Sequence, residues 1–126
     1  MKLLKCEICG NIVELVEDHG VPVMCCGKPM AVLTANTTEA ALEKHVPVAE
    51  VVEGNLHVKV GSVEHPMLAE HYITAIYVEM GNKVYRADLK PEEKPEAIFA
   101  LGDYKGTVTV YEYCNLHGLW KTEVEA

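Results

Sequence analysis

The stretch that decides the fold is residues 46–60, which read VPVAEVVEGNLHVKV. In the second half of this stretch apolar residues alternate with polar ones, which is the period of a strand that buries one face. The pair Gly54-Asn55 interrupts the pattern with residue types that are favoured in two-residue hairpin turns. We therefore predict a β-hairpin whose strands cover residues 46–53 and 56–60.

The same arrangement recurs towards the C-terminus. The pair Gly81-Asn82 separates strands that we predict at residues 72–80 and 83–89. Further strands are predicted at residues 97–101, 107–114 and 119–124. About seven short strands with turn signals between them are typical of an antiparallel β-sandwich, so the predicted fold class is all-β.

Residues 1–36 differ in composition from the rest of the chain. They hold four of the five cysteines and no Trp, Phe or Tyr. A segment this short cannot hold a fold by its core alone and should need a metal. After it, residues 36–44 combine a cap residue, Asn36, with good helix formers, which predicts one or two helical turns. The chain is therefore predicted to have a metal-binding domain at 1–36 and a β-sandwich at 37–126.

Composition and charge exclude several classes of function. The 126 residues carry a formal net charge of -8 and no Lys/Arg run, which argues against nucleic acid or an anionic membrane as partner. The N-terminus does not read as a signal peptide, and no apolar run approaches the ~20 residues that span a bilayer. We expect a cytoplasmic protein, in which thiols stay reduced and clustered cysteines bind metal. An anionic substrate would need local positive charge, because distant charges are screened.

Four cysteines form the first candidate site. They are Cys6, Cys9, Cys25 and Cys26. Four thiolates make a tetrahedral site that suits zinc or a single iron, and the spacing leaves both metals open. The glycines that follow Cys9 and Cys26 allow the chain to curl so that backbone N–H groups point at sulfur. The adjacent pair favours a distorted tetrahedron, and a disulfide interpretation would leave the glycine-flanked spacing unexplained.

A second candidate site combines histidines with the fifth cysteine. Four imidazoles and one thiolate lie at the ends of predicted elements, where sites on a rigid sandwich are usually built. They are His45, His65, His71, His117 and Cys114. Five donors exceed the four of a structural zinc site and leave a sixth position of iron open for a small molecule. We assign no role to His19, which lies in a loop, or to His57, which falls on the polar face of a strand.

Together these motifs resemble one family along essentially the whole chain. In chain order they are Cys6-x-x-Cys9, Cys25-Cys26-Gly27-Lys28-Pro29-Met30, Glu43-Lys44-His45-Val46-Pro47, His65-Pro66, His71-Tyr72 and Tyr113-Cys114-Asn115-Leu116-His117-Gly118-Leu119-Trp120. The set resembles desulfoferrodoxin, the two-iron form of superoxide reductase. The motifs follow the family's order, and no ligand is missing.

The resemblance implies a desulforedoxin-like domain, whose four cysteines hold a distorted tetrathiolate iron, followed by an immunoglobulin-like sandwich. In the sandwich, His45, His65, His71 and His117 would lie equatorially and Cys114 axially around a catalytic iron. The implied activity is the reduction of superoxide to hydrogen peroxide. The implied partners are a second copy of the chain, in a homodimer, and rubredoxin or a similar electron donor.

Residues next to one ligand are expected to assist this chemistry. Lys44 would attract the anionic substrate and organise a proton-donating water. Glu43 resembles the family's carboxylate that occupies the sixth position of ferric iron after turnover. Cys114, as an axial thiolate, would raise the electron density on iron. The tetrathiolate iron would be an electron relay or a structural metal.

Two other functions remain compatible with these residues. A superoxide dismutase would evolve oxygen and would need no external reductant. A non-catalytic electron carrier, or an iron or zinc binding module, would use the four histidines as structural ligands. The products formed from superoxide and the metal content distinguish these alternatives.

Overall fold

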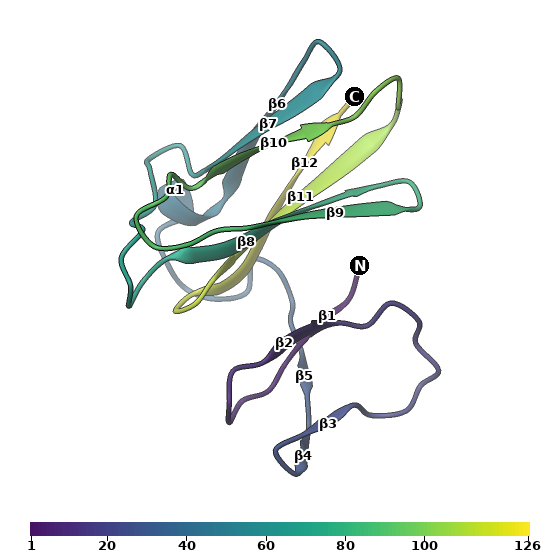
Figure 1. Ribbon diagram of the computed structural model, residues 1–126, viewed down its shortest axis with the longest axis vertical. Coiled ribbons are helices and arrows are strands. Elements are labelled where there is room, and N and C mark those ends of the chain that lie inside the picture. The colour runs from purple at the N-terminus through teal and green to yellow at the C-terminus, as the bar shows by residue number, and fades with distance from the viewer. The chain divides into compact units, whose positions relative to one another are not determined.

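The computed structural model describes residues 1–126 and separates into two compact units, Met1–Thr34 and Ala35–Ala126. The regular secondary structure of both units is almost entirely short β-strands, shown in sequence colours in Figure 1. The single helix, α1 (Leu42–His45), forms one turn. None of the helical structure is long and apolar enough to cross a membrane. The all-β fold class predicted from the sequence is confirmed.

The first unit is a small arrangement of five strands. They are β1 (Leu3–Lys5), β2 (Ile12–Glu14), β3 (Met24–Cys25), β4 (Lys28–Pro29) and β5 (Ala31–Val32). The strands β2, β1 and β5 form one antiparallel sheet in that order, and β3 pairs with β4 in a separate hairpin. None of these strands is longer than three residues, so hydrogen-bonded sheet alone gives this unit little stability.

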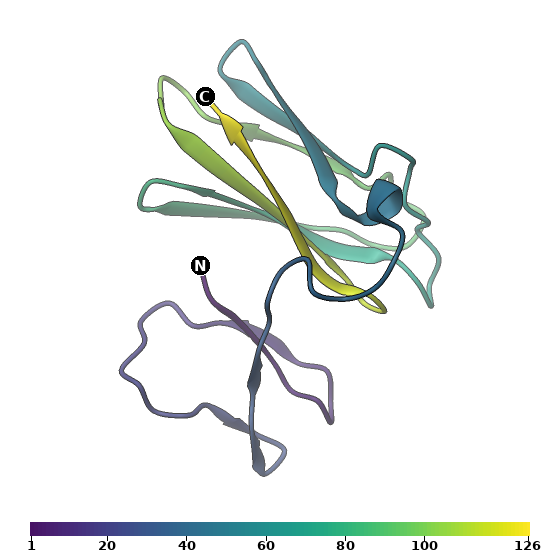
Figure 2. The same cartoon turned by 180° about the vertical axis from the view of Figure 1, so that it is seen from behind.

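The second unit is a two-layer sandwich. Its strands are β6 (Pro47–Val52), β7 (Asn55–Val60), β8 (Ile73–Met80), β9 (Lys83–Asp88), β10 (Glu96–Ala100), β11 (Thr107–Cys114) and β12 (Gly118–Glu125). One layer has the order β10-β7-β6 and the other the order β12-β11-β8-β9, with antiparallel pairing throughout. Figure 2 shows both layers from behind. The seven strands match the predicted number and positions closely.

The core lies between the two layers and follows directly from the alternating pattern. In β7 the residues Leu56, Val58 and Val60 are buried, whereas His57 and Lys59 point to the opposite, exposed face. The facing layer contributes further buried side chains: Ile76, Val78, Met80, Val108 and Val110. A period of two in the sequence therefore becomes one continuous apolar interior.

The first hairpin turn differs by one residue from the prediction. The loop between β6 and β7 is Glu53–Gly54, because Asn55 already belongs to β7 and pairs with Val52. Both loop residues have positive φ, 49° at Glu53 and 79° at Gly54, as a two-residue turn that matches the strand twist requires. The predicted turn at Gly81-Asn82 is confirmed.

The helix forms one turn, which is within the predicted one or two turns, but it begins later than predicted. Only Leu42–His45 is helical, and the preceding Ala41 provides no side-chain cap. The prediction that Asn36 caps this helix is wrong, because its side chain pairs instead with the backbone of Lys121 in β12. An Asn side chain that satisfies a strand edge cannot cap a helix as well, which leaves residues 37–41 non-helical.

Candidate metal centres

The first unit brings the four N-terminal thiols together. The sulfur atoms of Cys6, Cys9, Cys25 and Cys26 all lie within 4.8 Å of one another, with 3.6 Å between Cys9 Sγ and Cys25 Sγ. All five cysteines of the chain are free, so no disulfide competes for these atoms. Four sulfur donors converging from two tight turns suit a tetrahedral metal ion.

The turns also supply hydrogen bonds to sulfur. Gly10 and Gly27 adopt φ angles of 82° and 74°, which let each loop curl back over its cysteines. The backbone N–H of Cys9 points at Cys6 Sγ, 3.4 Å away. The N–H groups of Cys9 and Ile8 lower the pKa of Cys6 to about 6. A thiolate is therefore available at neutral pH.

The pKa values of Cys25 and Cys26 are raised rather than lowered. The neighbouring sulfurs of Cys9 and Cys6 raise the pKa of Cys26 to about 12, and contact with Cys6 and Cys9 also raises the pKa of Cys25. Four negative charges cannot sit this close without a compensating cation. The donor set therefore fits a bound metal ion far better than an empty cluster of thiols.

The second unit brings four imidazoles and Cys114 together at one end of the sandwich. His45 Nε2 lies 3.3 Å from His65 Nε2 and 3.0 Å from His117 Nδ1. The donor atoms of His45, His65, His71 and Cys114 all lie within 4.8 Å of one another. Every histidine that the sequence singled out for this site is therefore part of one group.

The imidazole rings form a closed cycle. Neighbouring ring centroids are 4.7–5.0 Å apart around the sequence His45, His65, His71, His117 and back to His45, with planes 76–88° to each other. His45 and His71 lie across the cycle, with their centroids 6.4 Å apart. Cys114 Sγ lies beside the cycle, 3.5 Å from His65 Nε2 and 3.8 Å from His117 Nδ1. This is a four-plus-one arrangement of donors.

Backbone carbonyls fix which ring nitrogen faces the centre. His45 donates from Nδ1–H to Ala41 O at 2.7 Å, and His65 donates from Nδ1–H to Pro66 O at 2.6 Å. The lone pairs on their Nε2 atoms therefore point inward, which is how metal-binding histidines are usually held. His71 Nε2 is buried without any hydrogen-bond partner. An orphaned buried nitrogen aimed at other donors fits a metal ligand.

A close backbone approach puts two of these histidines side by side. The loop after β7 lies against α1, where Val63 N donates to Glu43 O at 2.8 Å. Gly61 makes this possible, because a Cβ there would lie 2.6 Å from Glu43 O. His45, at the end of α1, and His65, at the end of this loop, can therefore meet.

The turn between β11 and β12 supplies the remaining donors. Pairing of β11 with β8 shifts register between Tyr113 and Cys114, a bulge of the kind often found beside functional sites. After it, Gly118 takes a φ of 82° and starts β12. Trp120 is 1% exposed, donates from Nε1 to His117 O at 3.0 Å, and lies with its ring 5.2 Å from that of His45. The turn is therefore anchored by a buried ring.

The group is buried on one side and open on the other. His45 and His65 are each 2% exposed and Cys114 is fully buried, whereas His71 and His117 are partly exposed. Burial lowers the pKa of His65 to about 4 and lowers the pKa of His45, so both rings are neutral and carry a free lone pair at physiological pH. Burial also raises the pKa of the Cys114 thiol. A small molecule would reach the group from the side of His71 and His117.

The side chains of Glu43 and Lys44 are both exposed on α1. Burial lowers the pKa of His71, and electrostatic repulsion from His117 and Lys44 lowers it further. The ammonium group of Lys44 therefore acts electrostatically on the open side of the group. Burial lowers the pKa of His45, and the carboxylate of Glu43 acts against this by raising it. The backbone carbonyl of Glu43 also holds the loop after β7, by accepting a hydrogen bond from Val63 N.

Sequence reasoning assigned no role to four residues that shape this site: Gly61 and Glu112, and the motif residues Asn115 and Trp120. Glu112 carried a readable signal, because it occupies an inward position of β11 between Val110 and Cys114. The structure buries it completely with neither carboxylate oxygen partnered. Burial raises the pKa of Glu112 to about 9, so a neutral carboxylic acid lies next to Cys114.

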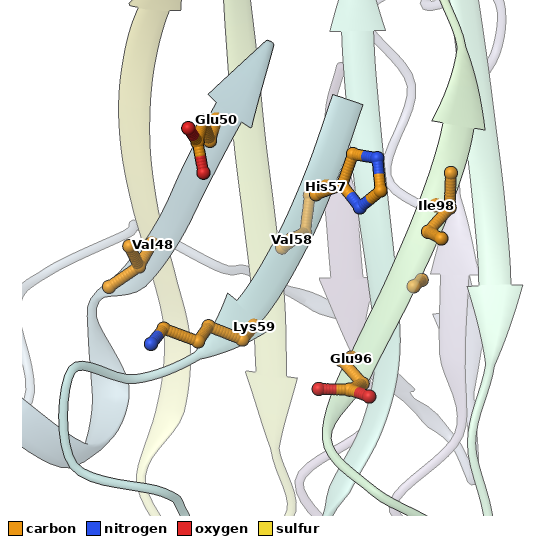
Figure 3. Close-up of a pocket in the computed structure, with 8 residues that line it drawn as sticks. Val48, Glu50, His57, Val58, Lys59, Glu96 and Ile98 are labelled. Carbon is orange, nitrogen blue, oxygen red and sulfur yellow. The ribbon is translucent and has the colours of Figure 1, made fainter. Parts of the chain in front are cut away.

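The two histidines left without a role lie away from both groups. His19 is exposed and lies 3.6 Å from Glu17 in an ion-pair geometry. His57 projects from the outer face of the β10-β7-β6 layer, as Figure 3 shows, where it borders a shallow hollow of about 460 Å³. Neighbours on this face are Glu50 and Ile98. The hollow contains none of the proposed ligands.

Comparison with known proteins gives the same family over both units. The family model described as Desulfoferrodoxin, N-terminal domain, matches residues 1–33, and the model described as Desulfoferrodoxin matches residues 37–123. A desulfoferrodoxin of Syntrophotalea carbinolica is 50% identical over 123 residues, which cover 98% of this chain and 96% of the relative. A superoxide reductase of Pyrococcus abyssi is 35% identical over 100 residues, which cover 66% of this chain and 87% of the relative.

Solved structures show the same similarity. The superoxide reductase of Treponema pallidum superimposes with a TM-score of 0.75 at 34% identity, covering 94% of this chain and 98% of that one. The one-iron superoxide reductase of Giardia intestinalis superimposes with a TM-score of 0.60 at 31% identity, covering 67% of this chain and 99% of that one.

Proposed function

The chain belongs to the desulfoferrodoxin family, and from this membership we propose that it is a superoxide reductase that converts superoxide to hydrogen peroxide. The observation that carries the proposal is the cycle of four imidazoles with Cys114 beside it. Five donors of this kind would hold an iron ion, which when bound would supply the electron for the reduction. The reaction consumes one superoxide, one electron and two protons for each hydrogen peroxide formed.

Two iron ions are the cofactors. One would be held by His45, His65, His71, His117 and Cys114, and the other by Cys6, Cys9, Cys25 and Cys26. The carbonyls of Ala41 and Pro66 keep the rings of His45 and His65 in the tautomer that binds metal. The burial of Cys114 keeps water away from its sulfur, so this donor stays a strong thiolate ligand once a cation neutralises it.

The chain's own residues provide attraction and proton delivery on the open side. Lys44 supplies positive charge there, against a net charge of -8 for the whole chain. Because screening mutes distant charges, this nearby ammonium group outweighs the acidic surface for an arriving anion. An exposed lysine also holds water, which can donate protons to the product.

Replacing Lys44 by alanine is expected to lower the second-order rate with superoxide about tenfold at low salt. The difference from wild type should shrink as salt is added, because screening removes the attraction in both proteins. Lys83→Ala, at the β8–β9 turn beyond the far end of β8, is the matched control and should keep the wild-type rate. Pulse radiolysis over a range of ionic strength measures both variants. An unchanged rate in Lys44→Ala at low salt would remove this residue from the mechanism.

Glu43 is proposed as the carboxylate that reaches the open side after turnover. Successive residues on a helix diverge by about 100°, so Glu43 and Lys44 cannot both point at the imidazoles while α1 keeps one conformation. The role of Glu43 therefore requires α1 to move. Such a movement would have to break the hydrogen bond from Val63 N to Glu43 O, because a single helical turn without a side-chain cap has few other bonds to hold it.

The remaining parts of the proposal concern partners and location. The tetrathiolate iron is proposed to relay electrons to the other centre, and a rubredoxin-like protein is proposed as the donor. Four coupled thiolates at tight turns suit one-electron exchange at the protein surface, where Cys9 and Cys26 are exposed. A homodimer in the cytoplasm, where thiols stay reduced, completes the proposal.

Anaerobic addition of superoxide to the reduced protein tests the function. The expected result is stoichiometric hydrogen peroxide without oxygen, with oxidation of the tetrathiolate iron following that of the other centre. Oxygen evolution without consumption of reductant would instead identify a dismutase. Oxidation by a carrier protein, with no reaction with superoxide, would identify an electron carrier. Zinc at both centres, with no visible absorption, would contradict the iron assignment.

A further inference from the structure

Asn115 lies between two of the proposed ligands, Cys114 and His117, in the turn that joins β11 to β12. It is half-buried, and its side chain contacts the segment before β8. That segment carries the ligand His71. Three hydrogen bonds connect the two stretches of chain.

The contacts of Asn115 surround His71 on both sides. Its Oδ1 accepts a hydrogen bond from Tyr72 N at 2.9 Å, and its Nδ2 donates to Glu70 O at 3.1 Å. Its own backbone N–H donates to Tyr72 O at 3.2 Å. Only a side-chain amide offers a donor and an acceptor in one plane at this length. The residues immediately before and after His71 are therefore both tied to Asn115.

His71 needs this support more than the other ligands do. His45 and His65 are each oriented by a hydrogen bond from Nδ1 to a backbone carbonyl, and the backbone carbonyl of His117 accepts a hydrogen bond from the buried Trp120. No side-chain hydrogen bond orients the ring of His71. Its backbone pairs only with Leu68 in an isolated bridge, within a loop that lacks regular strands between β7 and β8. The position of its ring therefore depends on where the backbone is fixed.

We propose that Asn115 is a positioning residue that sets the place of His71 relative to Cys114 and His117. The amide joins the turn bearing two ligands to the loop bearing a third, so that His71 approaches the group without a hydrogen bond of its own. The inference rests on the proposed function only in that these donors bind iron. It does not depend on what the iron reduces.

Metal release tests the proposal with three variants. Asn115→Leu keeps the size of the side chain and removes both polar atoms, and Asn115→Asp keeps the acceptor for Tyr72 N but loses the donor to Glu70 O. Asn82→Leu, an exposed residue in the β8–β9 turn, is the matched control. For each purified iron-loaded protein, transfer of iron to a chelator is followed through the visible absorption of the two centres. Thermal unfolding is measured with and without metal.

The expected result is selective. Asn115→Leu should release the iron of the histidine centre about 10- to 100-fold faster than wild type, as is typical when a residue that orients metal ligands is lost. Asn115→Asp should lie between Asn115→Leu and wild type, because one of the two side-chain bonds remains. The tetrathiolate iron should leave at the wild-type rate in every variant. The absorption of the histidine centre should also shift, which a general loss of stability would not cause.

Equal release rates in Asn115→Leu, Asn115→Asp and Asn82→Leu would overturn the proposal. So would a lower unfolding temperature without metal that is accompanied by unchanged release and unchanged absorption. Where Asn115→Leu does not fold, Asn115→Asp decides by the same two measurements. A chain that binds iron and shows the selective release, but forms no peroxide from superoxide, would disprove the proposed function while supporting the role of Asn115.

Discussion

Replacing Gly61 by alanine is expected to empty the centre formed by the four imidazoles and Cys114, and to lower superoxide reduction more than about 100-fold. The cause is steric. A Cβ on Gly61 would lie 2.6 Å from Glu43 O and 3.1 Å from Val46 O. Both are main-chain atoms, which cannot swing aside as the end of a flexible side chain can.

The two segments that the methyl group would force apart each carry a ligand. The helix α1 ends at His45, and the loop after Gly61 leads to His65. Their Nε2 atoms lie 3.3 Å apart, so a displacement of about 1 Å is a large fraction of the distance that the donors must keep. The hydrogen bond from Val63 N to Glu43 O would be lost at the same time.

Iron content per chain and the rate of superoxide reduction check this prediction. Gly102→Ala is the matched control, because Gly102 has a φ of +62° but no atom within 4 Å of the position that a Cβ would take. Alanine there adds backbone strain of about 1 kcal/mol without a collision, and should leave two irons and full activity. Wild-type iron content and rate in Gly61→Ala would show that α1 and the loop can separate without harm.

Raising the pH from 6 to 8 is expected to destabilise the wild-type protein relative to Glu112→Gln by on the order of 2 to 3 kcal/mol. Glu112 is fully buried in β11, opposite Ile76 on one side and Trp120 on the other, with both carboxylate oxygens unpartnered. Burial raises its pKa from 4.5 to about 9. The glutamine has the same shape and no proton to lose.

The direction of the effect follows from where the proton is bound. Below pH 4.5 the carboxyl of Glu112 is protonated in both the folded and the unfolded chain, so it contributes no pH dependence. Between pH 4.5 and about 9 the unfolded chain releases this proton and the folded chain keeps it. The free energy of unfolding therefore falls by up to about 1.4 kcal/mol for each pH unit in that window, and levels off above it.

Denaturant unfolding of the two proteins at several pH values measures the effect. Every other titrating group is shared, so the difference between the two stability curves isolates Glu112. An infrared difference spectrum at pH 7 should also show the C=O stretch of a protonated carboxyl that disappears in Glu112→Gln. Parallel stability curves, together with no such band, would mean that Glu112 is ionised in the folded protein.

The strands could be predicted from the sequence because their signals are local. Alternation in β7 and the Gly81-Asn82 pair each lie within a few residues, and the structure places the corresponding elements within one or two residues of the prediction. The turn before β7 lies one residue earlier than predicted, since Glu53 adopts a positive φ that its residue type does not indicate. The predicted start of the helix was wrong for a different reason: Asn36 pairs with Lys121, 85 residues away.

The candidate ligands could be chosen by residue type and spacing, whereas the residues that place them could not. Gly61 matters because it lies against the backbone of α1, and Asn115 because it meets the loop around His71. Both contacts join segments that the sequence keeps far apart. Glu112 is the exception, because an acidic residue at an inward strand position can be recognised from the alternating pattern alone.

The separation of the donors along the chain has a consequence for the order of assembly. His45 and His117 are 72 residues apart and lie at the ends of opposite layers, whereas Cys6 and Cys25 are only 19 residues apart. Closing the longer loop costs about 1 kcal/mol more chain entropy, and it also requires β11 and β12 to have paired. The N-terminal thiols can therefore capture their metal while the chain is still being synthesised. The histidine centre can be loaded only after the C-terminal hairpin has joined the finished sandwich.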